Sequence, residues 1–159
     1  MVMQDFFKRY IPEFVYGAVD GTVTTFAVVA ASAGAGISSS VILILGIANL
    51  IADGFSMGSS AYLAASAEHE ESVRDTQKRS SPKIIGAVTF LAFVVIGSVP
   101  VLPYLIDVIA NLKAPNAVLF YVSSALTAAT FLAIGFIKGK VSKQSPWQSA
   151  GITLLLGAI

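Results

Sequence analysis

Long apolar stretches alternate with short polar segments along the whole chain. An α-helix needs about 20 apolar residues to cross the roughly 30 Å hydrocarbon core of a bilayer. The first four apolar stretches reach that length, whereas the fifth contributes only 13 residues. We therefore predict an all-α integral membrane protein with five transmembrane helices, the fifth of them truncated. The predicted spans are residues 11–33, 41–65, 84–103, 118–137 and 147–159.

Composition supports a membrane protein and excludes an ordinary soluble fold. Hydrophobic residues make up 55% of the 159 residues and charged residues only 12%, whereas soluble domains are about 25% charged. The polar connections are short, so we predict one transmembrane domain over residues 1–159. The sequence contains no Cys, which excludes disulfides, thiolate metal sites and cysteine catalysis. We also predict no binding to nucleic acid.

The basic residues predict the orientation in the membrane. Nine of the ten lie before the first span, between the second and third, or after the fourth, and Lys113 is the tenth. Because basic residues accumulate on the cytosolic side, the N-terminus is predicted to be cytosolic. The nine are Lys8, Arg9, Arg74, Lys78, Arg79, Lys83, Lys138, Lys140 and Lys143.

Acidic residues inside the first two spans are the candidate functional groups. An ionisable side chain in a membrane span costs a few kcal/mol, so Asp20 and Asp53 are candidates for a transport site. Steps of three and four residues place Asn49, Asp53 and Met57 on one helix face. Asp20 shares a face of the first span with Glu13 by the same rule.

Helix rise places the two faces at a common depth. Consecutive spans run antiparallel, so Asp20 lies roughly 13 Å and Met57 roughly 12 Å from the cytosolic span ends. Carboxylate with thioether favours iron(II) or manganese(II) over magnesium or calcium. We predict a metal path with Asp20, Met57, Asp53 and Asn49 as ligands, and a cytosolic entry formed by Glu13, Glu68 and Glu71.

The same residues suggest proton coupling and a homodimer. Desolvation favours the neutral form of a carboxylate, so an arriving cation displaces a proton. One copy holds too few ligands for a divalent cation that takes about six, and a twofold dimer doubles the set. Two small-xxx-small patterns predict that the first two spans approach each other closely, Gly17 with Gly21 and Gly54 with Gly58. The predicted partners are a second copy, the lipid bilayer, the metal substrate and protons.

Two sequence blocks resemble the vacuolar iron transporter family. They are residues 19–29, VDGTVTTFAVV, and residues 48–68, ANLIADGFSMGSSAYLAASAE. The resemblance implies five spans, a dimer, and export of iron(II) or manganese(II) from the cytosol in exchange for protons. It assigns transport roles to Asp20 and Met57, and it implies no permanently bound cofactor because the metal is the substrate.

The chain departs from this family in two places. Many eukaryotic members insert a Glu- and Met-rich metal-binding domain where this chain has only residues 66–83, so no such module is expected. Some of those members carry an acidic residue where Asn49 stands, which leaves the role of Asp53 open. The compact form favours a bacterial inner membrane, or a vacuolar membrane in a eukaryote.

Other functions fit parts of the pattern. A small-multidrug-type antiporter also exchanges protons for an organic cation at a membrane carboxylate, although few aromatic residues lie near Asp20. In a membrane assembly protein without transport activity, Asp20 would bond to a hydroxyl such as that of Thr24, and Met57 would be core filler. Glu68 and Glu71 would then belong to a solvated helix end. An enzyme is not expected, because no catalytic motif is present.

Overall fold

The computed structural model describes the backbone of residues 2–71 and 80–157. It describes the side chains of residues 9–68 and 80–157. Within these ranges the regular structure is entirely helical, in keeping with the apolar periodicity of the chain. The elements are α1 (Val2–Gly34), α2 (Ser39–Glu71), α3 (Pro82–Gly97), the 3₁₀ turn η1 (Val99–Val101), α4 (Leu102–Ala110), α5 (Asn116–Val141) and α6 (Pro146–Gly157).

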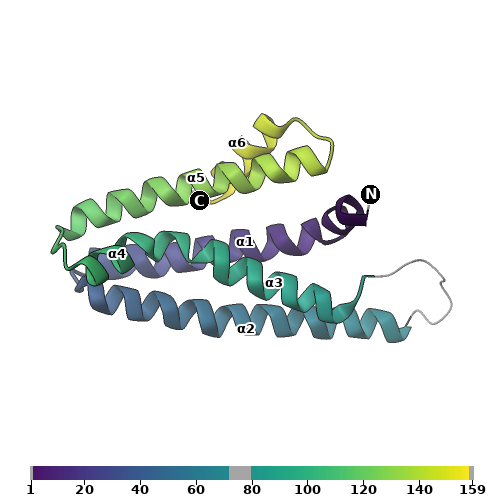
Figure 1. Cartoon of the computed structure of the whole chain (residues 1–159), viewed down its shortest axis with the longest axis horizontal. Helices are drawn as coiled ribbons and strands as arrows, with labels where there is room; N and C mark the ends of the chain where they lie inside the picture. Colours follow the sequence, from purple (N-terminus) through teal and green to yellow (C-terminus); the bar gives the residue numbers. More distant parts are fainter. Residues whose placement is uncertain (1, 72–79, 158–159) are drawn as a thin grey trace.

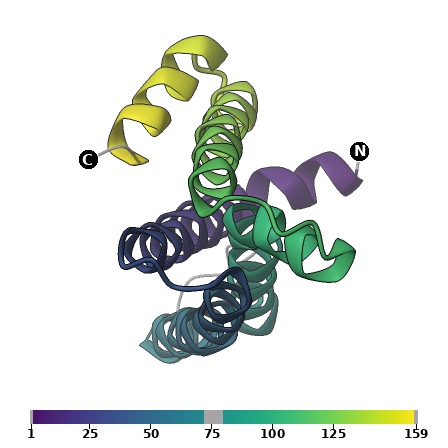
Figure 2. The same cartoon turned by 90° about the vertical axis from the view of Figure 1, so that its left-hand side faces the viewer.

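The long helices form a bundle around α1 and α3 (Figure 1). Viewed along the bundle, α1 and α3 lie side by side, with α2 on one side of them and α5 on the other (Figure 2). One buried cluster joins Val29, Ile42 and Tyr104 at one end of the bundle. A second cluster joins Ala18 of α1, Ala92 of α3 and Ile134 of α5 further along. The helices are thus held together by buried contacts of small and aliphatic side chains, with Tyr104 as a large aromatic member of the first cluster.

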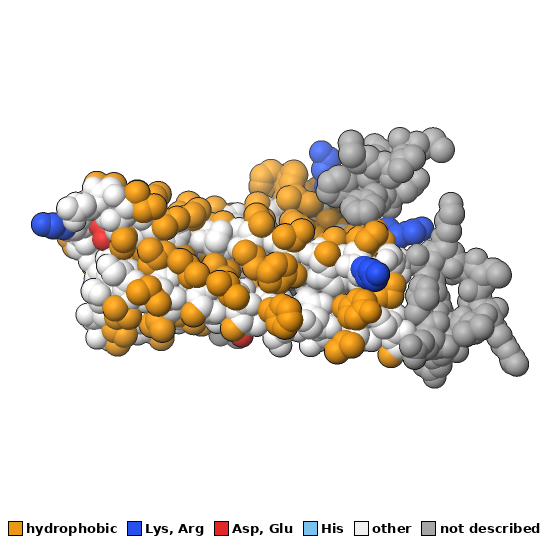
Figure 3. Space-filling view, turned by 60° about the horizontal axis from the view of Figure 1, so that its bottom comes forward, with side chains coloured by type: hydrophobic (Ala, Val, Ile, Leu, Met, Phe, Trp, Pro, Cys, Tyr) orange, Lys and Arg blue, Asp and Glu red, His pale blue; other side chains and the backbone are white. Residues whose placement is uncertain are grey.

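Among the described residues, four helical segments are long and apolar enough to cross a membrane. They are Arg9–Gly34, Ser39–Glu68, Pro82–Ala110 and Asn116–Val141. On the face shown in Figure 3, hydrophobic side chains are spread along the middle of the molecule, and the Lys and Arg side chains of the described residues lie toward its ends. Large apolar side chains such as Phe55, Leu91 and Tyr121 are exposed, as lipid contact requires. The prediction of an all-α integral membrane protein is confirmed.

The fifth predicted span, residues 147–159, contains most of α6. This helix has 12 residues, about 18 Å at 1.5 Å per residue, and folds back along α5 (Figure 1). It is therefore shorter than a membrane crossing within the described part of the chain.

The third helical segment continues beyond its predicted end at residue 103. Helix α3 stops at Gly97, η1 follows, and α4 runs on to Ala110. Pro103 lies in the first turn of α4, where a missing backbone N–H leaves no helical hydrogen bond unmade. Pro100 in η1 and Pro103 in α4 therefore interrupt the helix without ending the span.

Glycines bring both α1 and α2 close to α3. A Cβ added at Gly21 would overlap the backbone of Phe93, and one at Gly58 would overlap the backbone of Gly86. Gly17 likewise faces α3 at Thr89, and Gly54 faces it at Phe93. The sequence predicted that these glycines bring the first two helices together, but they face α3 instead. A small-xxx-small pattern marks a close approach without naming the partner.

Candidate functional site

Asp20 lies on α1 beside the glycine face that packs on α3. It is half-buried, as is Glu13 two turns earlier. Tyr16, which lies between them on the same face of α1, is 62% exposed. The face that the sequence predicted for Glu13 and Asp20 is therefore partly open to the surroundings of the chain.

Asp53 and Met57 occupy the matching edge of α2. Both are half-buried, and Gly54 and Gly58, each the next residue along, turn toward α3. The carboxyl groups of Asp53 and Asp20 are close enough to interact electrostatically. The structure thus brings together the two membrane acids that the sequence placed on separate helices, and we call this pair the acidic seam.

Asn49 connects α2 to α1 one turn beyond Asp53. Its side-chain amide donates to the hydroxyl of Thr25 at 3.2 Å and lies 3.4 Å from that of Thr24. Thr24 was considered in the sequence as a partner for Asp20, but its hydroxyl accepts from Asn49. The sequence did not predict a role for Thr25, which stands out only as part of the stretch TVTTF at residues 22–26.

The side chains of the predicted entry residues differ in burial. Glu13 has a buried Oε2 without a hydrogen-bond partner among the described residues. Glu68 is exposed near the end of α2. The side chain of Glu71 lies outside the described ranges. Of the predicted entry residues, Glu13 is therefore the one with a buried carboxylate oxygen that is available to bind a ligand.

The acidic seam alone is not a complete metal site. Within residues 9–68 and 80–157, no group of three or more His, Asp or Glu side chains could hold a metal ion. Two carboxylates, one thioether and one amide also fall short of about six ligands. Exposed residues flank the seam on both helices, namely Tyr16, Val23, Ser56 and Ser60. The seam is thus accessible to a second molecule.

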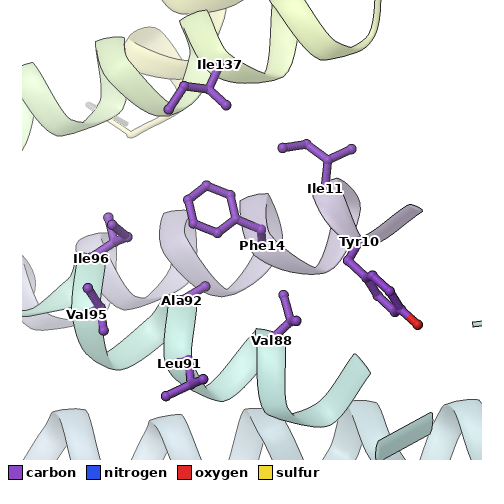
Figure 4. A pocket seen from close by; sticks show the side chains of 9 residues that line it. All are labelled: Tyr10, Ile11, Phe14, Val88, Leu91, Ala92, Val95, Ile96 and Ile137. Atoms are coloured by element: carbon purple, nitrogen blue, oxygen red, sulfur yellow. The ribbon is translucent and has the colours of Figure 1, made fainter. Parts of the chain in front are cut away.

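A deep hollow elsewhere has no ligands for a cation. It lies between α1, α3 and α5, has a volume of about 400 Å³, and is drawn in Figure 4. Phe14 of α1, Ala92 of α3 and Ile137 of α5 are among its lining residues, and Tyr10 supplies the one polar side chain. We call it the α1/α3/α5 cleft and do not assign it to transport.

A further buried acid, Asp107 of α4, is not part of the seam. It is 6% exposed, and its Oδ1 accepts the backbone N–H of Ala114 at 2.9 Å. Asn111 between them has a left-handed backbone that ends α4. Asp107 therefore stabilises the turn between α4 and α5, a role the sequence did not reveal.

Comparison with known proteins shows that the sequence of this chain is similar to those of vacuolar iron transporters. The model of the VIT family matches residues 11–83 and 70–159. Vacuolar iron transporter 1 of Eucalyptus grandis is 28% identical over 208 aligned positions, covering 94% of this chain and 81% of that protein. The vacuolar iron transporter of Toxoplasma gondii is 46% identical over 61 residues, 38% of this chain and 20% of that protein. Vacuolar iron transporter 1 of Arabidopsis thaliana is 37% identical over 75 residues, 47% of this chain and 30% of that protein.

These matches differ in how much of each relative they cover. The chain matches only about a fifth of the Toxoplasma protein, whereas it spans about four fifths of the Eucalyptus protein. The Eucalyptus alignment is longer than the 159 residues of this chain, so that relative carries additional residues within the matched region.

Proposed function

Because the chain belongs to the VIT family, we propose that it exports iron(II) or manganese(II) from the cytosol in exchange for protons. Several relatives that match it are named vacuolar iron transporters, which supports a metal ion as the substrate. The membrane we propose is a bacterial inner membrane, on the basis of the short connection at residues 66–83.

The observation that carries this proposal is that the carboxyl groups of Asp20 and Asp53, inside two apolar helices, lie within range of an electrostatic interaction. No Lys or Arg lies between Arg9 and Arg74 in the sequence, so neither helix supplies a cation within its span. Two like charges in a low-dielectric environment repel each other, and a divalent cation neutralises both at once. The seam is therefore suited to an ion of charge +2.

Met57 supports a transition metal over a hard cation. Its thioether lies one turn from Asp53 on the same edge of α2. Sulfur ligands favour softer ions, whereas magnesium and calcium prefer oxygen alone. We propose that Asp20, Asp53, Met57 and Asn49 contribute to the path, and that Glu13 and Glu68 lie at its cytosolic entry.

A homodimer would complete the ligand set. The exposed residues beside the seam leave it open to a second copy, and twofold symmetry would add two more carboxylates and a second thioether. Protons would replace the metal in the return step, since desolvation makes an unoccupied carboxylate favour its neutral form. We therefore propose that the path lies at the dimer interface.

Metal uptake into liposomes tests this function. Purified protein is reconstituted in vesicles with an acidic interior, and entry of iron(II) or manganese(II) is followed with a metal-quenched dye. Uptake should depend on the pH gradient and should be lost in Asp20→Asn and Met57→Ala. Asp107→Asn and Leu126→Ala are matched controls away from the seam and should retain uptake.

Each alternative function gives a different result. Full metal uptake by both seam variants would exclude the proposed path. Inhibition of proton-coupled metal uptake by bulky organic cations, with transport of those cations, would favour a small-multidrug-type antiporter. A stable folded dimer that binds no iron(II) or manganese(II) in calorimetry would favour an assembly protein.

A further inference from the structure

A second hollow lies between α2 and α3, and we call it the α2/α3 groove. Its volume is about 590 Å³. Gly58 and Gly86 cross at its floor, where a Cβ on either residue would overlap the other helix. The lining residues are Phe55, Gly58, Ser59, Tyr62, Leu63, Lys83, Gly86, Ala87 and Phe90. The glycine crossing and small side chains thus leave a furrow between aromatic walls.

The groove lies on the side of α2 opposite the acidic seam. Phe55 follows Asp53 by two residues, which is about 200° around a helix, and Tyr62 follows Met57 by five residues, or about 140°. Phe55 is 69% exposed, and Leu63, further along the groove, is also exposed. If the seam lies at a dimer interface, the groove faces the lipid.

One end of the groove carries a basic side chain. Lys83 is the second residue of α3 and lines the groove directly. The N-cap residue Ser81 makes no side-chain cap, and the first turn of α3 contains no acidic residue. The uncompensated helix N-terminus adds to the positive potential beside the Lys83 ammonium.

We propose that the α2/α3 groove binds an anionic phospholipid of the cytosolic leaflet. One acyl chain would lie along Phe55, Tyr62 and Phe90, and the phosphate would meet the Lys83 ammonium. Apolar furrows with a basic rim at the membrane surface suit acidic headgroups. The α1/α3/α5 cleft of Figure 4 has no charged lining residue and so lacks this headgroup contact.

Native mass spectrometry of the delipidated full chain in detergent tests this site. The protein is titrated with dioleoyl phosphatidylglycerol and, separately, with dioleoyl phosphatidylcholine. The anionic lipid should bind more tightly, and Lys83→Gln should reduce that preference about fivefold, the contribution of one basic residue at a membrane surface. Ala87→Phe fills the groove and should weaken binding of both lipids.

Two control variants separate the groove from general effects. Lys140→Gln removes an exposed charge of α5 that does not line the groove. Leu91→Phe places a larger side chain in the lining of the α1/α3/α5 cleft instead. Both should bind phosphatidylglycerol as the unchanged protein does. Equal affinity for the two lipids, or an equal loss of preference in Lys83→Gln and Lys140→Gln, would overturn the proposal. Unchanged lipid binding by Ala87→Phe would also overturn it.

Discussion

The side-chain amide of Asn49 in α2 donates a hydrogen bond to the hydroxyl of Thr25 in α1, with 3.2 Å between nitrogen and oxygen. This bond lies one turn beyond Asp53 and therefore bounds the acidic seam on the side away from Glu68. The two helices pack mainly on α3 rather than on each other. A polar bond between them is thus a specific link at the end of the proposed path.

Breaking this link should destabilise the bundle by a measurable amount. Hydrogen bonds between membrane helices contribute about 0.6 kcal/mol on average and up to about 1.7 kcal/mol. We expect a coupling free energy in this range from a double-mutant cycle of Asn49→Ala and Thr25→Val, measured by unfolding in mixed micelles. A cycle of Asn49→Ala with Ser124→Ala should show no coupling, since Ser124 bonds to a carbonyl of its own helix, α5. Additive effects of the first pair would contradict the link.

Gly21 and Gly151 should respond in opposite directions to the same substitution. A Cβ at Gly21 would overlap the backbone of Phe93, whereas one at Gly151 of α6 meets no atom within 4 Å. Gly21→Ala should therefore cost about 1–3 kcal/mol through overpacking. Gly151→Ala should stabilise its helix by about 0.5–1 kcal/mol, because Gly loses more backbone entropy than Ala on folding.

Thermal unfolding of the two variants in detergent measures this difference. The melting temperature should fall for Gly21→Ala and should hold or rise for Gly151→Ala. A similar melting temperature for both would show that α1 and α3 separate enough to accept the methyl group, and would contradict the close contact at Phe93.

The sequence predicted the positions of the helices better than it predicted which helices pack against each other. Hydropathy located the four long helices, because lipid requires long apolar runs. It did not predict that Gly17 and Gly58 face α3, since the complementary surface at Gly86 and Thr89 carries no motif of its own. The run to Ala110 was also missed, because prolines such as Pro100 and Pro103 are typical of a helix end, whereas the structure shows a new helix that starts at Leu102.

For the candidate site, periodicity identified the polar edges of α1 and α2. It could not supply the side-chain contacts that connect them. Asn49 was predicted as a metal ligand, and its bond to Thr25 depends on how the two helices are rotated around α3. Asp107 was missed because its partner is a backbone N–H, which every residue except proline possesses.

Asp20 and Asp53 should act as one unit in transport. Their carboxyl groups interact across the seam, and a divalent cation needs the charge of both. We expect Asp20→Asn and Asp53→Asn each to reduce initial uptake of manganese(II) into vesicles strongly. The double variant should be scarcely worse than the more damaged single one, because residues that share a function are not additive. Multiplicative losses would instead assign the two acids to separate steps.

Replacing Asp107 should lower stability and leave transport unchanged, because its carboxylate accepts a backbone hydrogen bond that the acids of the seam lack. The Ala114 N–H bonds to Asp107 Oδ1, whereas neither Asp20 nor Asp53 accepts a hydrogen bond within the described ranges. Asp107→Ala should leave the Ala114 N–H unpaired and cost about 1–3 kcal/mol of stability. Asp107→Asn keeps an acceptor oxygen and should cost less. Metal uptake per folded protein should be unchanged in both, measured after size-exclusion of the folded fraction. Loss of uptake at full stability would make Asp107 part of the transport path.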